Sequence, residues 1–361
     1  MTIEIHPIEM PTTATEPGER GDAFREHHAL AERSAAARYA PGVLDLTADE
    51  RLTAWATTAT ERNVRLGARL DGRLVGAAHL WLPLAESTDV LDFGTAAEPG
   101  LDASTARAVH AALVERALAV AGTERRRTIM GGSPGAATGD RTAATGFGAA
   151  DPGHPEAAPL VAAGFELEQV YRVSLLHLDA VHDLRARLEA ASARSRGYDV
   201  VAWQGETPGV HREAMRRLHE RMSTDAPVGG LALEPEVWSD ERLAAFEQQK
   251  AEGGRTIRTV AARDASGTLV GFSTLFVGSG DVARQHDTLV VREHRGHGLG
   301  MLLKLANLVE LDGHHPGHRR VSTWNAEENR PMLATNEAVG FAPIAYEAVW
   351  QRTPRDERTA A

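Results

Sequence analysis

The stretch that most constrains the fold of this chain runs from Thr288 to Leu311 and contains three glycines at alternate positions. Residues 288–291 have strand character, and the apolar run 301–311 has helical propensity. A strand that enters a helix through glycines forms an anion site, because the first helical turn has unpaired N–H groups and the positive end of the helix dipole. Glycines also let a phosphate approach that backbone closely. The sequence therefore predicts a phosphate-containing ligand at residues 295–300.

The spacing of these glycines narrows the kind of ligand. No Gly-Lys-Ser/Thr follows them, which excludes a P-loop, and G-x-G-x-G is not the dinucleotide fingerprint G-x-G-x-x-G. Residues 295–300 instead form an R-x-x-G-x-G pattern, which resembles the pyrophosphate loop of the GNAT superfamily of acyl-CoA-dependent N-acyltransferases. The alternative is a glycine-rich helix cap without a ligand. The resemblance implies that acyl-CoA is bound by Arg295, Gly296, His297, Gly298, Leu299 and Gly300.

Composition limits the classes of protein to consider. A length of 361 residues suggests two domains, and a net charge of −11 argues against nucleic acid or an anionic membrane as a partner. The chain has no cysteine, so it has neither disulfides nor a cysteine nucleophile. The first ten residues show no signal-peptide pattern, and no apolar run is long enough for a membrane span. We therefore expect a cytoplasmic protein, either a monomer or a homodimer.

Two parts of the chain repeat one pattern of strands and helices. The hairpin segment Gly72–Gly76 (GRLVG) matches Gly267–Gly271 (GTLVG), and the pair Gly164-Phe165 matches Gly340-Phe341. This arrangement resembles tandem GNAT proteins. It implies an α/β (α+β) fold of two GNAT-like domains, each with a mixed, mostly antiparallel sheet flanked by helices. The predicted parts are a first half (1–178), a linker helix (179–196) and a second half (197–361), with residues 131–155 as a mobile loop.

The first half lacks the glycine loop at the matching position. Residues 98–103 read Glu-Pro-Gly-Leu-Asp-Ala, without the arginine and with one glycine. Glu98 and Asp102 would place negative charge where a pyrophosphate should bind, and Asp102 is better explained as a helix N-cap. We therefore interpret the first half as a degenerate copy that covers or shapes the site of the second. The competing interpretation is a separate ligand site in the first half.

The resemblance also assigns roles around the loop. It implies that main-chain groups of the preceding strand bind the pantetheine arm and the acyl carbonyl, and that Asn325 and Asn329 contact the cofactor. The alternative for Asn325 is a helix cap alone. Many family members have a tyrosine as general acid four residues before the Gly-Phe pair, but this chain has Asn336 there. An amide can donate a hydrogen bond but cannot supply a proton, so Asn336 is predicted to act without being an acid. The residues of the preceding strand to which the resemblance assigns these main-chain contacts are Leu289, Val290 and Val291.

A general base is expected just before the loop. His286 shares the strand parity of Thr288 and Val290, whereas Asp287 points to the other face unless a bulge intervenes. An imidazole accepts a proton near neutral pH, so His286 is slightly preferred and Asp287 is the second candidate. The alternative is that both are ordinary polar strand residues.

Acceptor binding is expected after the first helix of the second half. Asp225 could pair with a cationic amine there, although an aspartate before Ala-Pro is equally a turn former. The histidine-rich loop 314–318 has no carboxylate pattern or partner motif, so no metal is expected.

These observations predict an N-acetyltransferase. Its second half would transfer the acetyl group of acetyl-CoA to a primary amine of a small molecule by direct attack, with a longer acyl group as an open alternative. Because the tyrosine is replaced, a second hypothesis is a non-catalytic module that binds CoA or another metabolite.

Overall fold

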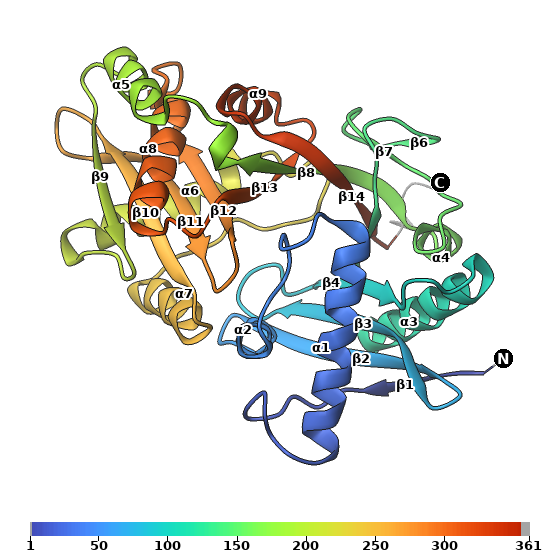
Figure 1. Cartoon of the computed structure of the whole chain (residues 1–361). Helices are drawn as coiled ribbons and strands as arrows, with labels where there is room; N and C mark the ends of the chain where they lie inside the picture. The colour runs from blue at the N-terminus through green and yellow to red at the C-terminus, as the bar shows by residue number, and fades with distance from the viewer. Residues whose placement is uncertain (1, 355–361) are drawn as a thin grey trace.

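The computed structural model describes residues 2–354. Among these residues, twelve strands form one continuous sheet that crosses the whole molecule (Figure 1). Parallel pairing joins β4 to β5 and β12 to β13, and the other neighbours are antiparallel. From one edge to the other the strands are β1 (Ile3–Pro7), β2 (Glu61–Leu70), β3 (Arg73–Pro83), β4 (Val90–Ala97), β5 (Thr128–Pro134), β14 (Ala342–Arg352), β8 (Glu166–His177), β13 (Arg320–Ala326), β12 (Val282–Val290), β11 (Leu269–Val277), β10 (Thr256–Arg263) and β9 (Asp199–Gln204).

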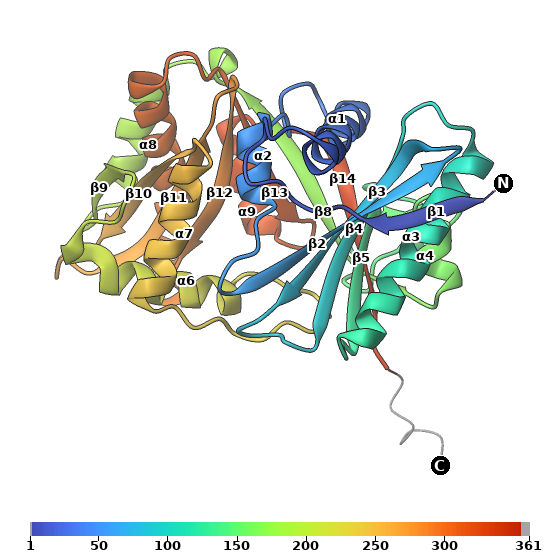
Figure 2. The same ribbon diagram turned by 90° about the horizontal axis from the view of Figure 1, so that it is seen from below.

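Helices cover both faces of each half of this sheet. In the first half, α3 and α4 lie on one face and α1 and α2 on the other (Figure 2). In the second half, α5 and α8 pack on one face, whereas α6 and α7 pack on the opposite face. Within residues 2–354, no helix combines the length and the apolar character that crossing a membrane requires. The helices are α1 (Glu19–Arg38), α2 (Ala48–Ala54), α3 (Ala103–Thr123), α4 (Ala157–Ala162), α5 (Leu184–Arg194), α6 (Arg212–Asp225), α7 (Asp240–Glu252), α8 (Leu299–His314) and α9 (Arg330–Val339).

The two halves are joined by an exchange of strands. β14, the last strand of the chain, lies between β5 and β8 of the first half, and β8 in turn lies between β14 and β13. Trp350 of β14 is fully buried in the apolar core of the first half, and its indole N–H donates to the Ser133 hydroxyl at 2.9 Å. The core of the first half therefore depends on residues from the C-terminal end of the chain.

The predicted hairpins and the mostly antiparallel α/β fold are confirmed. In the first hairpin, Asp71 and Gly72 both have positive φ (50° and 77°), as a two-residue turn between strands requires. The loop prediction for residues 131–155 is wrong at its start, because β5 continues to Pro134. Gly131 serves close packing there: a Cβ atom would lie 3.0 Å from the side chains of Leu160 and Phe93. Two very short strands follow, β6 (Arg141–Thr142) and β7 (Ala149–Ala150).

Three buried histidines should make the fold sensitive to acid. Burial lowers the pKa of His27 and of His110 to about 3 and that of His219 to about 4, all from 6.5. Only the unfolded chain takes up these protons at mildly acidic pH. The stabilisation is therefore complete above pH 6.5 and is lost as the pH falls towards 4, by about 1.4 kcal/mol per histidine and pH unit.

Urea unfolding at a series of pH values would measure this loss. His27→Phe is the matched variant, because the His27 ring packs against Trp55, with ring centres 4.5 Å apart, and its Nδ1 has no hydrogen-bond partner within the described chain. We expect the variant to lose less stability between pH 7 and pH 5 than the wild type. If the variant and the wild type lost equal stability over this pH range, protonation of His27 would not contribute to the acid sensitivity of the fold.

Candidate active site

The second half of the sheet opens next to the glycine loop. β12 and β13 pair in parallel only where residues 282–284 lie beside residues 320–322, although both strands continue further. The Val291 N–H donates to the Val270 carbonyl of β11 at 3.0 Å. Main-chain groups alternate in direction along a strand, so Leu289 also faces β11, whereas Val290 and Thr288 face the opening. Of the three predicted main-chain contacts, only Val290 therefore turns its N–H towards the opening.

The glycine loop has the open geometry that a phosphate needs. Gly296 and Gly298 have φ values of 85° and 76°, in the left-handed region that favours glycine, and Gly298 is the N-cap of α8. No side chain caps this helix, and a Cβ atom at Gly296 would meet nothing within 4 Å. The Ser195 hydroxyl donates to the His297 carbonyl at 2.9 Å and so ties the loop to the end of α5. The first N–H groups of α8 are thus presented to an anion, which fits the pyrophosphate of acyl-CoA.

Arg295 connects this loop to α6. Its Nε donates to the Val290 carbonyl at 3.0 Å, and its guanidinium pairs with the Asp225 carboxylate at 3.1 Å. Arg221 lies 3.5 Å from the same carboxylate. Asp225, the residue predicted to bind the amine, is therefore already paired with two arginines, and it does not belong to the cavity described below.

The three predicted asparagines lie in β13 (Asn325), at the N-cap of α9 (Asn329) and within α9 (Asn336). The Asn329 side chain caps α9 by accepting from the Met332 N–H at 3.4 Å. Asn336 is 2% exposed, and its side-chain amide donates to the Asn325 side-chain oxygen at 2.6 Å. The side-chain oxygen of Asn336 has no partner within the described chain. Asn336 therefore holds the Asn325 side chain in place.

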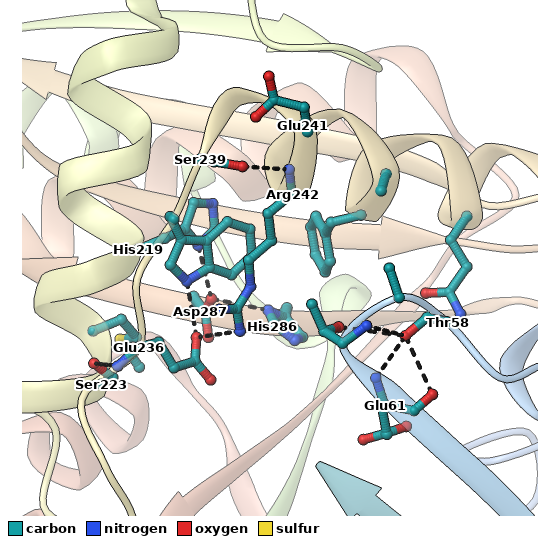
Figure 3. Close-up of a pocket in the computed structure, with 17 residues that line it drawn as sticks. Thr58, Glu61, His219, Ser223, Glu236, Ser239, Glu241, Arg242, His286 and Asp287 are labelled. Carbon is teal, nitrogen blue, oxygen red and sulfur yellow. Dashed lines mark hydrogen bonds and ion pairs between the residues drawn. The ribbon is translucent and has the colours of Figure 1, made fainter. Parts of the chain in front are cut away.

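A β-bulge brings both candidate bases to the same side. Thr288 pairs with Ser273 and Gln285 with Leu275, so β12 has one residue more than β11 between these pairs. His286 and Asp287 occupy the bulge, and both line one cavity (Figure 3). The buried Gln285 amide stabilises the bulge by donating to the Thr274 carbonyl at 2.8 Å and to the Ser273 hydroxyl at 3.0 Å. No sequence pattern had indicated Gln285; a glutamine in a strand was the only available signal.

The charges in the bulge are arranged around Asp287. His286 Nδ1 lies 3.2 Å from the Asp287 carboxylate, and His219 Nδ1 of α6 lies 3.8 Å from it. Burial by itself raises the pKa of Asp287, but neighbouring His286, which also forms a hydrogen bond to it, and the charge of Arg284 hold it below its ordinary value. Asp287 is therefore ionised at neutral pH, whereas buried His219 is neutral.

The cavity beside the bulge has a volume of about 800 Å³ and is built by both halves of the chain. The second half contributes the bulge residues together with parts of α6, α7 and the segment before α7, including His219, Trp238 and Phe246. The first half contributes the turn 58–61 that leads into β2. Apart from the bulge residues and the end of α6, sequence reasoning had not indicated these residues, because they are brought together only by the packing of the two halves. A cavity of this size can hold a small-molecule acceptor.

The matching loop of the first half is closed. Arg33 of α1 forms a two-pronged ion pair with Glu98 at 2.8 and 2.7 Å. Asp102 caps α3, as predicted, by accepting from the N–H groups of Ser104 and Thr105 at 3.0 Å. The Asp102 carboxylate at the start of α3 would repel a pyrophosphate, and Arg33 is already paired with Glu98.

The histidine-rich loop has local roles. His314 contacts the Glu310 carbonyl at 3.0 Å, and His318 contacts the Gly278 carbonyl at 3.1 Å. Across residues 2–354, no three side chains of the metal-binding types are placed to hold one ion.

Comparison with known proteins identifies the fold. No family model and no curated protein matches the chain. Among solved structures, it is similar to a tandem GNAT protein from the clavulanic acid biosynthesis pathway, with 26% identity, a TM-score of 0.73 and coverage of 98% of this chain and 100% of that one. The chain has the fold of the GNAT superfamily, in its tandem form.

Two more distant GNAT-like structures agree with this fold. A GCN5-related N-acetyltransferase from Sphaerobacter thermophilus has 14% identity, a TM-score of 0.58 and coverage of 92% of both chains. The N-myristoyltransferase of Saccharomyces cerevisiae, solved with bound myristoyl-CoA and inhibitors, has 7% identity, a TM-score of 0.56 and coverage of 97% of this chain and 80% of that one. The GNAT fold supports acyl transfer in general, and the expectation of an acyl-CoA-dependent N-acyltransferase is confirmed at that level.

Proposed function

We propose that this GNAT protein is an N-acetyltransferase that uses its second half to transfer the acetyl group of acetyl-CoA to a primary amine of a small molecule. The main supporting observation is the order of groups along β12. The bulge at His286 and Asp287, the outward N–H of Val290 and the open glycine loop follow one another in the chain. An acceptor cavity, a candidate carbonyl-binding group and a phosphate site therefore adjoin each other.

The proposed reaction is direct attack. The amine nitrogen forms a bond to the thioester carbon, the carbon–sulfur bond breaks, and the thiolate leaves with the electron pair. The Val290 N–H is the candidate donor to the carbonyl oxygen as negative charge develops on it. Acetyl-CoA supplies the activated acyl group, and the N–H groups at residues 298–300 bind its pyrophosphate.

The bulge supplies the base. An ionised Asp287 can only accept hydrogen bonds, so the Nδ1 of His286 beside it must be the donor. The Nε2 of His286 is then free to accept the proton that the amine loses. Asp287 orients this ring, while Asn336 acts through Asn325 and supplies no proton. A thiolate is only weakly basic and can leave with hydrogen bonding alone.

Replacement of the bulge residues tests this assignment. With acetyl-CoA and a panel of primary amines, we expect His286→Ala to lower kcat about 10²- to 10⁴-fold, because general-base catalysis contributes about that factor. Asp287→Ala should lower kcat as well and change its pH dependence. Thiol release measures turnover, and His318→Ala is a control outside the cavity. Unchanged turnover in both bulge variants would exclude these bases.

The replacement of the usual tyrosine by Asn336 favours one competing function, a module that binds CoA or another metabolite without catalysis. Such a module would bind acetyl-CoA but release no thiol with any amine.

A series of acyl-CoA chain lengths in the same assay would test the preference for acetyl.

A further inference from the structure

We propose that the acceptor has at least two ammonium groups, and that the first half of the chain builds the subsite for the second one. This inference rests on the proposed function, because the first ammonium is the one delivered to the bulge. The subsite is the turn Thr58–Glu61, with Glu61 as its charged residue.

The turn that forms this wall is rigid. The Thr58 hydroxyl accepts from the Glu61 N–H at 3.1 Å and from the Thr60 N–H at 3.3 Å, and the Thr58 N–H donates to the Glu61 carbonyl at 2.8 Å. Ala59 is exposed at the tip of the turn and lines the cavity. The wall is therefore preorganised and faces elements of the second half across the cavity (Figure 3).

Two carboxylates of the cavity lining, Glu61 and Glu241, form no ion pair within residues 2–354. Arg242 is the arginine of the lining, and its guanidinium is paired with Glu86 at 2.9 Å and Glu236 at 3.4 Å. Glu61 and Asp287 therefore place carboxylates on two walls of the cavity, which favours a cationic ligand.

Glu61 is the carboxylate that gains most from a ligand cation. Burial raises its pKa, while the hydrogen bond from Asn63 and the more distant charges of Arg65 and Lys250 lower it without fully compensating. A ligand ammonium would stabilise the ionised form, because an opposite charge nearby offsets the cost of burial. Figure 3 shows Glu61 apart from the bulge residues His286 and Asp287, and the two walls come from opposite halves of the chain, so we assign a separate ammonium to each. A molecule with two separated ammonium groups matches both.

The experiment compares diamines with monoamines of matched length. Putrescine and cadaverine are assayed against butylamine and pentylamine at saturating acetyl-CoA. The wild type should have a KM at least about tenfold lower for the diamines, as one charge-assisted hydrogen bond provides. Glu61→Gln should raise the diamine KM about tenfold and leave kcat and the monoamine KM unchanged. Ala59→Phe should raise the KM for both amines, because it narrows the cavity, without changing acetyl-CoA affinity.

Two measurements keep this test separate from that of the proposed function. Glu115→Gln on the exposed face of α3 makes the same change of net charge far from the cavity and should have no effect. Calorimetric titration of putrescine into the wild type and Glu61→Gln reports the subsite even without turnover. Acetyl-CoA binding without acetylation of any amine would refute the function, whereas equal putrescine affinities for wild type and Glu61→Gln would refute the subsite.

Discussion

Replacing Trp350 with alanine should lower the free energy of unfolding by about 3–5 kcal/mol, the usual cost of removing a fully buried tryptophan side chain. Trp350 has 0% exposure and belongs to the core of the first half, although it lies close to the C-terminal end of the chain. Its loss leaves a cavity and also removes the partner of the Ser133 hydroxyl. Because β14 joins β5 to β8, the loss should affect both halves of the sheet.

Urea unfolding followed by far-ultraviolet circular dichroism measures this effect. Trp81→Ala is the matched control, since Trp81 lies in β3 of the same half but is only partly buried. We expect Trp81→Ala to lower the free energy of unfolding clearly less than Trp350→Ala does. If the two variants lost equal stability, Trp350 would not have the structural role that the exchange of strands assigns to it.

The variant Gly298→Glu should lose most of its affinity for acetyl-CoA, by about two orders of magnitude. A carboxylate about 5 Å from a phosphate charge costs about 3 kcal/mol at an effective dielectric constant near 20. The side chain would also extend from the N-cap of α8, where the phosphate is expected to approach the backbone. A thermal-shift titration with acetyl-CoA would show this loss.

The first half offers a closely matched control for this variant. Gly100 has a φ of 89°, against 76° for Gly298, and lies in the loop before α3. Gly100→Glu therefore imposes similar backbone strain and the same charge, but it should leave acetyl-CoA binding unchanged. If binding were lost in Gly100→Glu and kept in Gly298→Glu, the cofactor would bind in the first half. No shift in the wild type would refute the cofactor assignment.

Much of the fold could be predicted from local patterns. The two hairpins and the N-cap at Asp102 depend on residues that are close in sequence, and the tandem GNAT fold could be inferred because its landmarks recur. Among the elements that were not predicted are β1, α2 and the two-residue strands β6 and β7. β1 is only five residues long, and α2 is a single short helix, although its capping box between Thr47 and Glu50 was a readable signal.

The candidate site was only partly predictable for a different reason. His286 and Asp287 could be named, but a regular strand would have placed them on opposite faces. Whether a bulge forms depends on the partner strand, and here the Gln285 amide satisfies the Thr274 carbonyl opposite it. Asp225 was predicted to bind the amine, but the structure pairs it with Arg221 and Arg295. Arg295 is far from Asp225 in the sequence, so this pairing could not be predicted from local patterns.

The sequence by itself determined the glycine loop, because the left-handed conformations of Gly296 and Gly298 and the free N–H groups of α8 are local properties of a glycine-rich turn before a helix. Only the tertiary structure decided how the two halves share their strands and their cavity. Strand order arises from contacts between distant segments, such as β14 with β5, and the cavity is lined jointly by the turn 58–61 and the distant helix α7. Such contacts depend on the packing of whole elements, which no short pattern of residues encodes.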